Sequence, residues 1–243
     1  MKIVAKTDIG LTRKQNQDAY AAGELPCGIG WAVVCDGMGG AAGGAIASTT
    51  AVRHIADNVT ALFRNGFGEM NIRNILTSVI ENANTQVFDM AMKNEELRGM
   101  GTTVVVAVTD GKRVNIAHVG DSRAYRLSAD GVITQITADH SVVQQMVNRG
   151  EITAEEARFH PNRHIITRAV GVSDRVIVDF DEYESQDGDV LLICSDGLTG
   201  YVTDECIGQV MRDGKVYDYP ERLVELANQN GGGDNVTVVV MAQ

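Results

Sequence analysis

Six short runs with the composition of β-strands divide this chain, and most of them are bounded by glycine or aspartate. They occupy residues 29–35, 102–109, 113–119, 122–127, 189–194 and 236–241. Such runs are too short for typical helices, and their β-branched residues favour strands. Asp110-Gly111 and Asp130-Gly131 have the composition of tight hairpin turns. The hairpins predict antiparallel pairing of the strands beside them.

Two longer stretches carry apolar residues at the three- and four-residue spacing of an amphipathic helix. They cover residues 52–62 and 72–90. Near the C-terminus, Pro220 marks a helix start and the glycines at 231–233 mark its end, which indicates a further pair of helices. Hairpins, then paired helices, then more hairpins predict an α+β fold, because a parallel sheet would require alternating strands and helices.

The chain shows no sign of division into separate domains. It has 243 residues, three prolines, no internal repeat and no low-complexity tract, so we expect one domain over residues 1–243. The polar, mixed segment at about 137–171 interrupts the strand pattern. We expect this segment to form a small helical excursion from the sheets.

Charge and cysteine content limit the partners and the compartment. The formal net charge of −11 argues against a broad electrostatic contact with nucleic acid or anionic lipid. No apolar run approaches the ~20 residues of a membrane helix, and the first residues lack a signal-peptide core, so we expect no membrane insertion. The four cysteines stand far apart without a C-x-x-C pair, which favours free thiols in the cytoplasm. We expect a monomer.

Four aspartates share one local setting, beside glycine at the end of a predicted strand. They are Asp36 before Gly37, Asp121 after Gly120, Asp196 before Gly197, and Asp234 after three glycines. Each one alone is most simply a turn residue. Together, carboxylates on strand ends can converge at one sheet edge, where glycine carbonyls add further oxygen ligands. Hard cations such as Mg²⁺ and Mn²⁺ prefer such ligands, so the pattern predicts a divalent metal site.

Other chemistries have weaker support in the sequence. Arg13 lies in a polar turn, where its planar guanidinium suits a phosphate, although a simple surface arginine has the same appearance. The glycine-rich stretch 36–44 lacks the lysine of a P-loop and the spacing of a dinucleotide fingerprint. No G-x-S-x-G elbow or catalytic cysteine signature is present, so the residues do not support a nucleophilic side chain.

Seven motifs then occur in a fixed order along the chain. They are RKQNQD at 13–18, DGMGG at 36–40, GTT at 101–103, HVGDSR at 118–123, ITRAVG at 166–171, SDGL at 195–198 and GGDNVT at 232–237. Over nearly its full length the chain resembles the metal-dependent protein phosphatase family (PPM, or protein phosphatase 2C), and its bacterial branch in particular. The resemblance implies two antiparallel β-sheets sandwiched between helix layers (α-β-β-α), with a flap subdomain at about 137–171.

The same resemblance implies a set of site residues and cofactors. Two tightly bound Mn²⁺ or Mg²⁺ ions and a third, weaker ion are expected. By this resemblance, Asp36 bridges two metals, Asp196 and Asp234 complete the ligands of one, and the Gly37 carbonyl completes those of the other. Asp18 acts through a water, and Asp121 serves the third ion. Arg13 holds the substrate phosphate. These remain what the resemblance implies, because spacing alone does not assign them.

The implied activity is that of a serine/threonine protein phosphatase. A water that bridges two cations attacks the phosphomonoester directly, without a phospho-enzyme. The implied substrates are phosphoserine and phosphothreonine proteins, including a cognate Ser/Thr kinase. Two alternatives stay open: another two-metal phosphoesterase, such as a nuclease or phosphodiesterase, and a phosphatase dedicated to a single anti-sigma-type regulatory partner. The residues do not identify the general acid.

Overall fold

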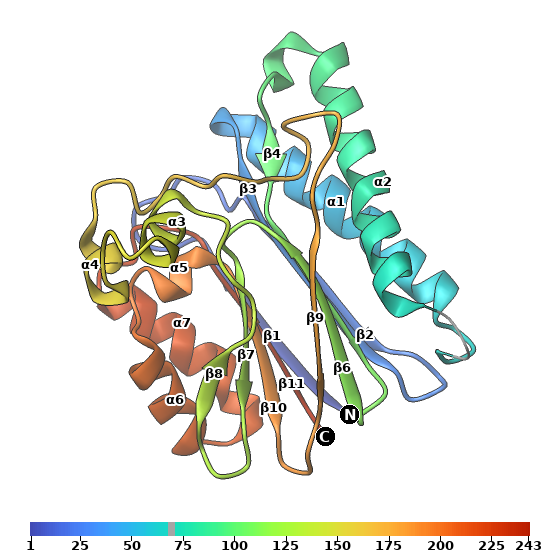
Figure 1. The fold of residues 1–243 in the computed structure, drawn as a ribbon, viewed down its shortest axis with the longest axis vertical. Helices are drawn as coiled ribbons and strands as arrows, with labels where there is room; N and C mark the ends of the chain where they lie inside the picture. The colour runs from blue at the N-terminus through green and yellow to red at the C-terminus, as the bar shows by residue number, and fades with distance from the viewer. Residues whose placement is uncertain (68–70) are drawn as a thin grey trace.

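A computed structural model describes residues 1–67 and 71–243, and two antiparallel sheets form its centre (Figure 1). The first sheet has the order β1-β11-β10-β7-β8; the second has the order β2-β3-β5-β6-β9, with β4 beside β3. The first sheet comprises β1 (Lys2–Asp8), β7 (Arg123–Leu127), β8 (Ile133–Gln135), β10 (Val190–Cys194) and β11 (Val236–Ala242). The second comprises β2 (Asp18–Glu24), β3 (Gly30–Met38), β4 (Gly101–Thr102), β5 (Val104–Thr109), β6 (Arg113–Val119) and β9 (Asp179–Glu184).

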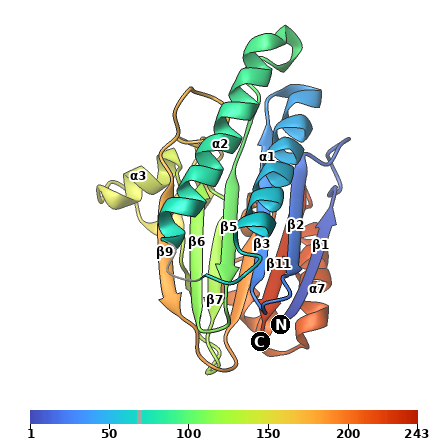
Figure 2. The same cartoon turned by 90° about the vertical axis from the view of Figure 1, so that its right-hand side faces the viewer.

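Helices cover the outer face of each sheet, which gives four layers. Figure 2 shows α1 (Gly40–Leu62) and α2 (Ile72–Lys93) lying over the second sheet. In Figure 1, α5 (Asp196–Thr199), α6 (Asp204–Arg212) and α7 (Tyr219–Gln229) lie on the side of the first sheet. Two short 3₁₀ turns, η1 (Glu95–Leu97) and η2 (Val216–Asp218), precede β4 and α7. The predicted α-β-β-α architecture is confirmed.

Strand β3 shows how the sequence produces these layers. Successive side chains of a strand point to opposite faces, so a strand covered on both faces is apolar throughout. Val33 and Cys35 belong to the core under α1 and α2, whereas Ala32 and Val34 belong to the core between the two sheets. All four side chains are fully buried. The continuous apolar run before Asp36 is therefore the mark of a central strand in a four-layer fold.

Several strand and helix predictions are confirmed, and the hairpins pair as expected. β5 pairs with β6 across Asp110-Gly111, and β7 pairs with β8 across Asp130-Gly131. Helix α1 begins at Gly40, well before the periodic apolar residues that predicted it, because small residues fill its first turns. Pro220 lies in the first turn of α7, as the sequence indicates.

Other boundaries differ from the prediction. β3 continues through Asp36 and Gly37 to Met38, because its last two residues pair with β4. The predicted strand 102–109 is divided at Thr103, whose amide donates a hydrogen bond to the Asp36 carbonyl. Strands β1, β2, β8 and β9 lie outside the six predicted runs. β2 and β9 carry small or acidic residues, which have low strand propensity, and their neighbours in the sheet decide their conformation.

The segment 137–171, which we call the flap segment, carries two short helices between β8 and β9. Helix α3 (Val142–Asn148) begins with Ser141, whose hydroxyl accepts a hydrogen bond from the Gln144 amide. Helix α4 (Ala154–Phe159) begins with a capping box formed by Thr153 and Glu156. Figure 1 shows α3 and α4 at one end of the sandwich, close to α5. These side chains satisfy the first free amides of helices too short to be stable alone.

Two further observations concern the cysteines and the apolar character of the helices. All four cysteines are free thiols, two of them buried and two exposed. Within residues 1–67 and 71–243, no helix combines the length and the apolar character needed to cross a membrane.

Candidate metal centre

Five aspartates from both sheets converge at one edge of the sandwich. Asp18 begins β2 and lies directly opposite Asp36 of β3. Asp121 stands two residues after β6, Asp196 two residues after β10, and Asp234 two residues before β11. Because β10 and β11 are antiparallel neighbours, the end of one lies beside the start of the other. The topology therefore brings together carboxylates that are far apart in the sequence.

The carboxylates repel one another in a poorly solvated space. Burial raises the pKa of Asp36 well above its ordinary value, and the charges of Asp18, Asp196 and Asp121 raise it further. Burial likewise raises the pKa of Asp121 and of Asp196. For Asp18, burial and the neighbouring carboxylates raise the pKa to about 7, although two hydroxyl hydrogen bonds oppose the shift. A divalent cation among these groups would reverse the repulsion.

Two buried carboxylate oxygens indicate where such a cation fits. Asp18 Oδ1 and Asp196 Oδ1 are buried and have no hydrogen-bond partner among the described residues. A buried, unpaired charge is costly unless a ligand satisfies it. The donor set consists of carboxylate oxygens, which suits Mg²⁺ or Mn²⁺ better than a metal that prefers nitrogen or sulfur. The residues present therefore fit hard divalent cations.

The other oxygen of Asp18 is held by two hydroxyls from the first sheet. Asp18 Oδ2 accepts hydrogen bonds from Ser195 Oγ and Thr237 Oγ1, each at 2.7 Å. Ser195 Oγ in turn accepts from the Thr237 amide at 2.9 Å. Thr237 Oγ1 also lies 2.8 Å from the hydroxyl of Thr7 on β1. Ser195 and Thr237 lie within two of the seven motifs, but no role for them was predicted from the sequence.

The backbone around Asp36 and Gly37 is fixed by close contacts. The Asp36 amide donates to Thr103 Oγ1 at 2.9 Å, and Thr103 Oγ1 lies 2.7 Å from Ser122 Oγ. The Gly37 amide donates to the Gln17 carbonyl at 3.1 Å. A Cβ atom on Gly37 would collide with the Gly44 carbonyl, so only glycine fits where β3 meets the start of α1.

Arg13 lies at the mouth of this cluster and contacts Asp234. Its Nη2 donates to Asp234 Oδ2 at 2.7 Å, and half of the arginine side chain (51%) remains exposed. The hydrogen bond to Asp234 is the main cause that raises the pKa of Arg13. The guanidinium has five N–H donors, so this contact leaves donors available for a phosphate beside the carboxylates.

Asn235 fastens the loop that carries Arg13. Its Oδ1 accepts from the Gln17 amide at 2.8 Å, and its Nδ2 donates to the carbonyls of Ile9 and Gln15 at 2.9 and 3.1 Å. The residue is buried. No role for Asn235 was predicted from the sequence, although an asparagine directly after Asp234 is the available signal.

Two cavities meet over the aspartates. One, of about 670 Å³, is lined by Arg13, Asp36, Gly37, Asp121, Asp196 and Asp234 together with neighbouring loop residues. The other, of about 580 Å³, lies between the flap segment and the residues around α5 and α6. Both are lined by Asp121, His164, Asp196, Tyr201 and Asp234. The carboxylates therefore lie where a group on an extended substrate can reach them, and His164 of the flap segment lies beside them.

Comparison with known proteins places this geometry in a family. The sequence pattern described as protein phosphatase 2C matches residues 12–232. The serine/threonine protein phosphatase PstP of Mycobacterium tuberculosis is 37% identical over 243 residues, which cover 99% of this chain and 44% of PstP. The chain thus spans less than half the length of that relative.

Solved structures agree with the sequence comparison. The crystal structure of serine/threonine phosphatase Stp1 from Staphylococcus aureus has a TM-score of 0.89 and 38% identity, covering 100% of this chain and 94% of that one. The catalytic domain of PstP in complex with two manganese ions has a TM-score of 0.86 and 35% identity, covering 98% and 96%. On its fold, its motifs and these likenesses, the chain belongs to the protein phosphatase 2C (PPM) family.

Proposed function

We propose that this chain hydrolyses phosphoserine and phosphothreonine on proteins, using two tightly bound Mn²⁺ or Mg²⁺ ions and a third, weaker one. The observation that carries the proposal is the convergence of five carboxylates beside a half-exposed arginine. Two of the carboxylates have a buried oxygen without a hydrogen-bond partner among the described residues. Membership of the family and the two manganese ions in the PstP structure support it.

The proposed metal roles are those that the family resemblance implies, and the convergence of the aspartates supports them. Asp36 would hold both tight ions, with Asp196 and Asp234 as further ligands of one and the Gly37 carbonyl as a further ligand of the other. Asp18 would act through a water, and Asp121 would serve the third ion. When bound, divalent cations supply an activated water for attack on phosphorus and neutralise charge on the phosphoryl oxygens.

The chain's own residues bind and orient the substrate. Asp234 bonds the Arg13 guanidinium, and Asn235 anchors the backbone of the loop that carries Arg13, so the guanidinium lies beside the carboxylates for a contact with phosphoryl oxygens. Ser195 and Thr237 keep Asp18 in one rotamer by holding one of its oxygens. The cavity beside the flap segment offers room for the peptide around the phosphorylated residue. Prior positioning of these groups lowers the entropic cost of reaching the transition state.

The proposed partners are phosphoproteins, including a Ser/Thr kinase, and the proposed state is a monomer. The free thiols are consistent with the cytoplasm as its compartment. The net charge of −11 disfavours the alternative of a nuclease, because nucleic acid is a polyanion. No observation in the described part of the chain favours a single anti-sigma-type partner over a broader set.

A substrate panel tests the proposal. The protein with Mn²⁺ is given phosphoserine, phosphothreonine and phosphotyrosine peptides, a phosphodiester and single-stranded DNA, and released phosphate or cleaved product is measured. We expect rapid hydrolysis of the first two peptides and little of the others. Faster turnover of the diester or of DNA than of the phosphopeptides would overturn the proposal.

A further inference from the structure

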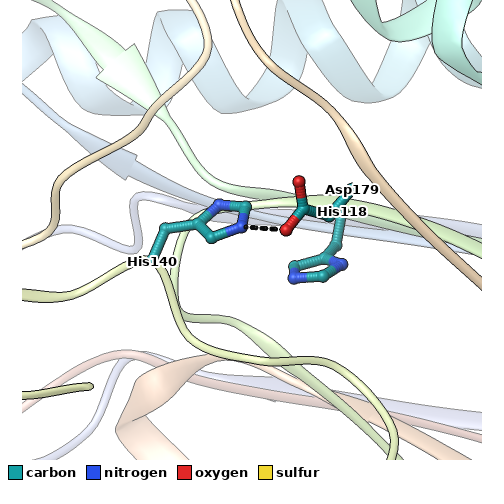
Figure 3. A group of neighbouring side chains, drawn as sticks. All are labelled: His118, His140 and Asp179. Atoms are coloured by element: carbon teal, nitrogen blue, oxygen red, sulfur yellow. Dashed lines mark hydrogen bonds and ion pairs between the residues drawn. The ribbon is translucent and has the colours of Figure 1, made fainter. Parts of the chain in front are cut away.

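A second polar cluster lies beside the metal centre, at the end of β6. It contains His118, His140 and Asp179 (Figure 3). His118 on β6 pairs in register with Asp179 on β9. The imidazole of His140, from the start of the flap segment, stacks on that of His118 with ring centroids 4.8 Å apart and planes at 18°. Both histidines are buried.

His140 holds the peptide that leads into Asp121 at two points. The His140 amide donates to the Gly120 carbonyl at 2.9 Å. The Gly120 amide donates to His140 Nδ1 at 3.1 Å. Gly120 has a φ of +108°, and a Cβ atom there would collide with Thr103, so this turn depends on glycine and on outside contacts. The two bonds therefore set the direction in which the chain enters Asp121.

The contact with Gly120 decides the protonation of His140. A backbone N–H can only donate, so Nδ1 must be unprotonated and the proton lies on Nε2. Burial lowers the pKa of His140, which keeps the ring neutral. Nε2–H then points to Asp179 Oδ2 at 3.1 Å (Figure 3). Arg168 Nη1 donates to Asp179 Oδ1 at 2.8 Å. Arg168 Nη1 also lies 3.1 Å from His140 Nε2, because both nitrogens donate to the same carboxylate.

The same tautomer argues against a metal ion in this cluster, although ligand atoms of the three residues lie within 4.8 Å of one another. A cation on His140 Nε2 would force the ring proton onto Nδ1, where it would face the Gly120 N–H. The Arg168 guanidinium would also lie beside the cation. Gly120, His140, Asp179 and Arg168 are therefore linked by successive hydrogen bonds, and we call this set of residues the relay.

The relay joins both ends of the flap segment to the metal centre. His140 lies at its start and Arg168 at its end, and the Thr167 amide donates to the His140 carbonyl at 2.7 Å. We propose that His140 is a positioning residue. It couples the base of the flap segment, where Thr167 bonds to His140, to the backbone at Gly120 that orients Asp121. Loss of either end of the relay then weakens the third cation site. The statement about that site rests on the proposed function, because it takes Asp121 as a ligand.

Two variants of His140 separate the halves of the relay. In His140→Asn, the amide oxygen takes the place of Nδ1 and still accepts from Gly120, but the link to Asp179 is lost. In His140→Gln, the amide nitrogen takes the place of Nε2 and still donates to Asp179, but the acceptor for Gly120 is lost. Amide hydrogen exchange of Gly120 and Thr167 by NMR, and calorimetry of Mn²⁺ binding, are measured for each.

The relay predicts different results for the two variants. In His140→Gln, the Gly120 amide exchanges about tenfold faster than in the unmodified protein, as loss of one buried hydrogen bond implies. The weakest Mn²⁺ site loses affinity by a similar factor, while the two tight sites are unchanged. In His140→Asn, Gly120 keeps more of its protection than in His140→Gln, and Thr167 at the flap base exchanges faster.

Arg168→Met provides a test that leaves His140 intact, in case a histidine variant fails to fold. Among the described residues, the side-chain hydrogen bonds of Arg168 go to His140 and Asp179 and not to Gly120, so faster exchange of the Gly120 amide in Arg168→Met would show that the relay transmits the change. His54→Gln, on α1, is the matched control and should change neither readout. The proposal is overturned if Gly120 exchange and the weakest Mn²⁺ affinity stay at the unmodified values in every folded variant of His140 and Arg168. Hydrogen exchange requires no turnover, so this result is distinct from failure of phosphopeptide hydrolysis.

Discussion

Asp18 and Asp36 lie directly opposite each other on the paired strands β2 and β3. Like charges at facing positions destabilise an antiparallel pair. Burial adds to the cost and raises the pKa of both groups. Only one oxygen of Asp18 is satisfied by described residues, through Ser195 and Thr237. The metal-free fold therefore carries an electrostatic strain that a bound cation would relieve.

Mn²⁺ should stabilise the protein, and Asp36→Asn should remove most of that effect. A cation at one hundred times its dissociation constant contributes about 2.7 kcal/mol to the free energy of unfolding for a single site. Without metal, Asp36→Asn should be more stable than the unmodified protein, since it removes a repelled charge. Thermal unfolding with Mn²⁺ and with a chelator measures both effects. Asp213→Asn, at the exposed end of α6, is the control, and an equal Mn²⁺ shift in Asp36→Asn would contradict the assignment.

Asp18 should make the stability of the metal-free protein fall as the pH rises. Its pKa is about 7 in the fold, against an ordinary 3.8. Between these values the folded state binds more protons than the unfolded state, so the free energy of unfolding decreases with pH, by at most about 1.4 kcal/mol per unit for one group. Denaturant unfolding at pH 4.5, 6 and 7.5 with a chelator, compared with Asp18→Asn, isolates this contribution. If the free energy of unfolding of the unmodified protein instead increased with pH relative to that of Asp18→Asn, the raised pKa of Asp18 would be refuted.

The class of fold was accessible from the sequence because hairpin turns and apolar periodicity are local signals. Asp110-Gly111 predicted one hairpin, and the apolar run before Asp36 predicted a strand, which pairs with neighbours on both sides. Strand β9 was missed because its acidic residues resemble a loop, and pairing with β6 alone makes it a strand. Context of this kind cannot be read from composition.

Four of the five candidate aspartates, all except Asp18, were accessible because each stands at a strand end beside glycine. The residues that hold these aspartates and their loops in place could not be predicted in the same way. The hydrogen bond from Thr237 to Asp18 joins residues 219 positions apart, and no local pattern reports it. Asn235 and His140 likewise act on segments that only the tertiary fold brings near.

Thr237→Val should make Mn²⁺ binding more sensitive to pH. The hydroxyl stabilises the charged form of Asp18, and a hydrogen bond to a charged group contributes about 1.5–3 kcal/mol, or roughly one to two pKa units. Without the hydroxyl, the pKa of Asp18 is higher, so a cation competes with a bound proton over a wider range of pH. Calorimetry should show a greater loss of affinity at pH 6 than at pH 8. Thr237→Ser keeps the hydroxyl and should behave like the unmodified protein; equal losses at both pH values in Thr237→Val would contradict the role.

Arg13→Ala should raise KM and lower kcat/KM. A guanidinium that holds a phosphate contributes about 2–3 kcal/mol through charged hydrogen bonds, which corresponds to a loss of roughly 30- to 150-fold. Arg13→Lys should recover little, because an ammonium cannot make the bidentate contact. Steady-state kinetics on a phosphoserine peptide supply the measurement, with Arg53→Ala on the exposed face of α1 as the control. Kinetics unchanged from the unmodified protein would leave Arg13 without a role in substrate binding.

The central claim is that the aspartate cluster is a metal-dependent phosphatase centre. The most direct measurement is phosphate release from a phosphoserine peptide as a function of Mn²⁺, for the unmodified protein and for Asp36→Asn, with Asp213→Asn as the control. Activity should rise with Mn²⁺, disappear with a chelator and remain in Asp213→Asn. In Asp36→Asn it should fall by more than about a hundredfold, since the metals contribute several kcal/mol to the transition state. Hydrolysis that persists in the chelator, or an Asp36→Asn variant that keeps the unmodified rate, would contradict the account.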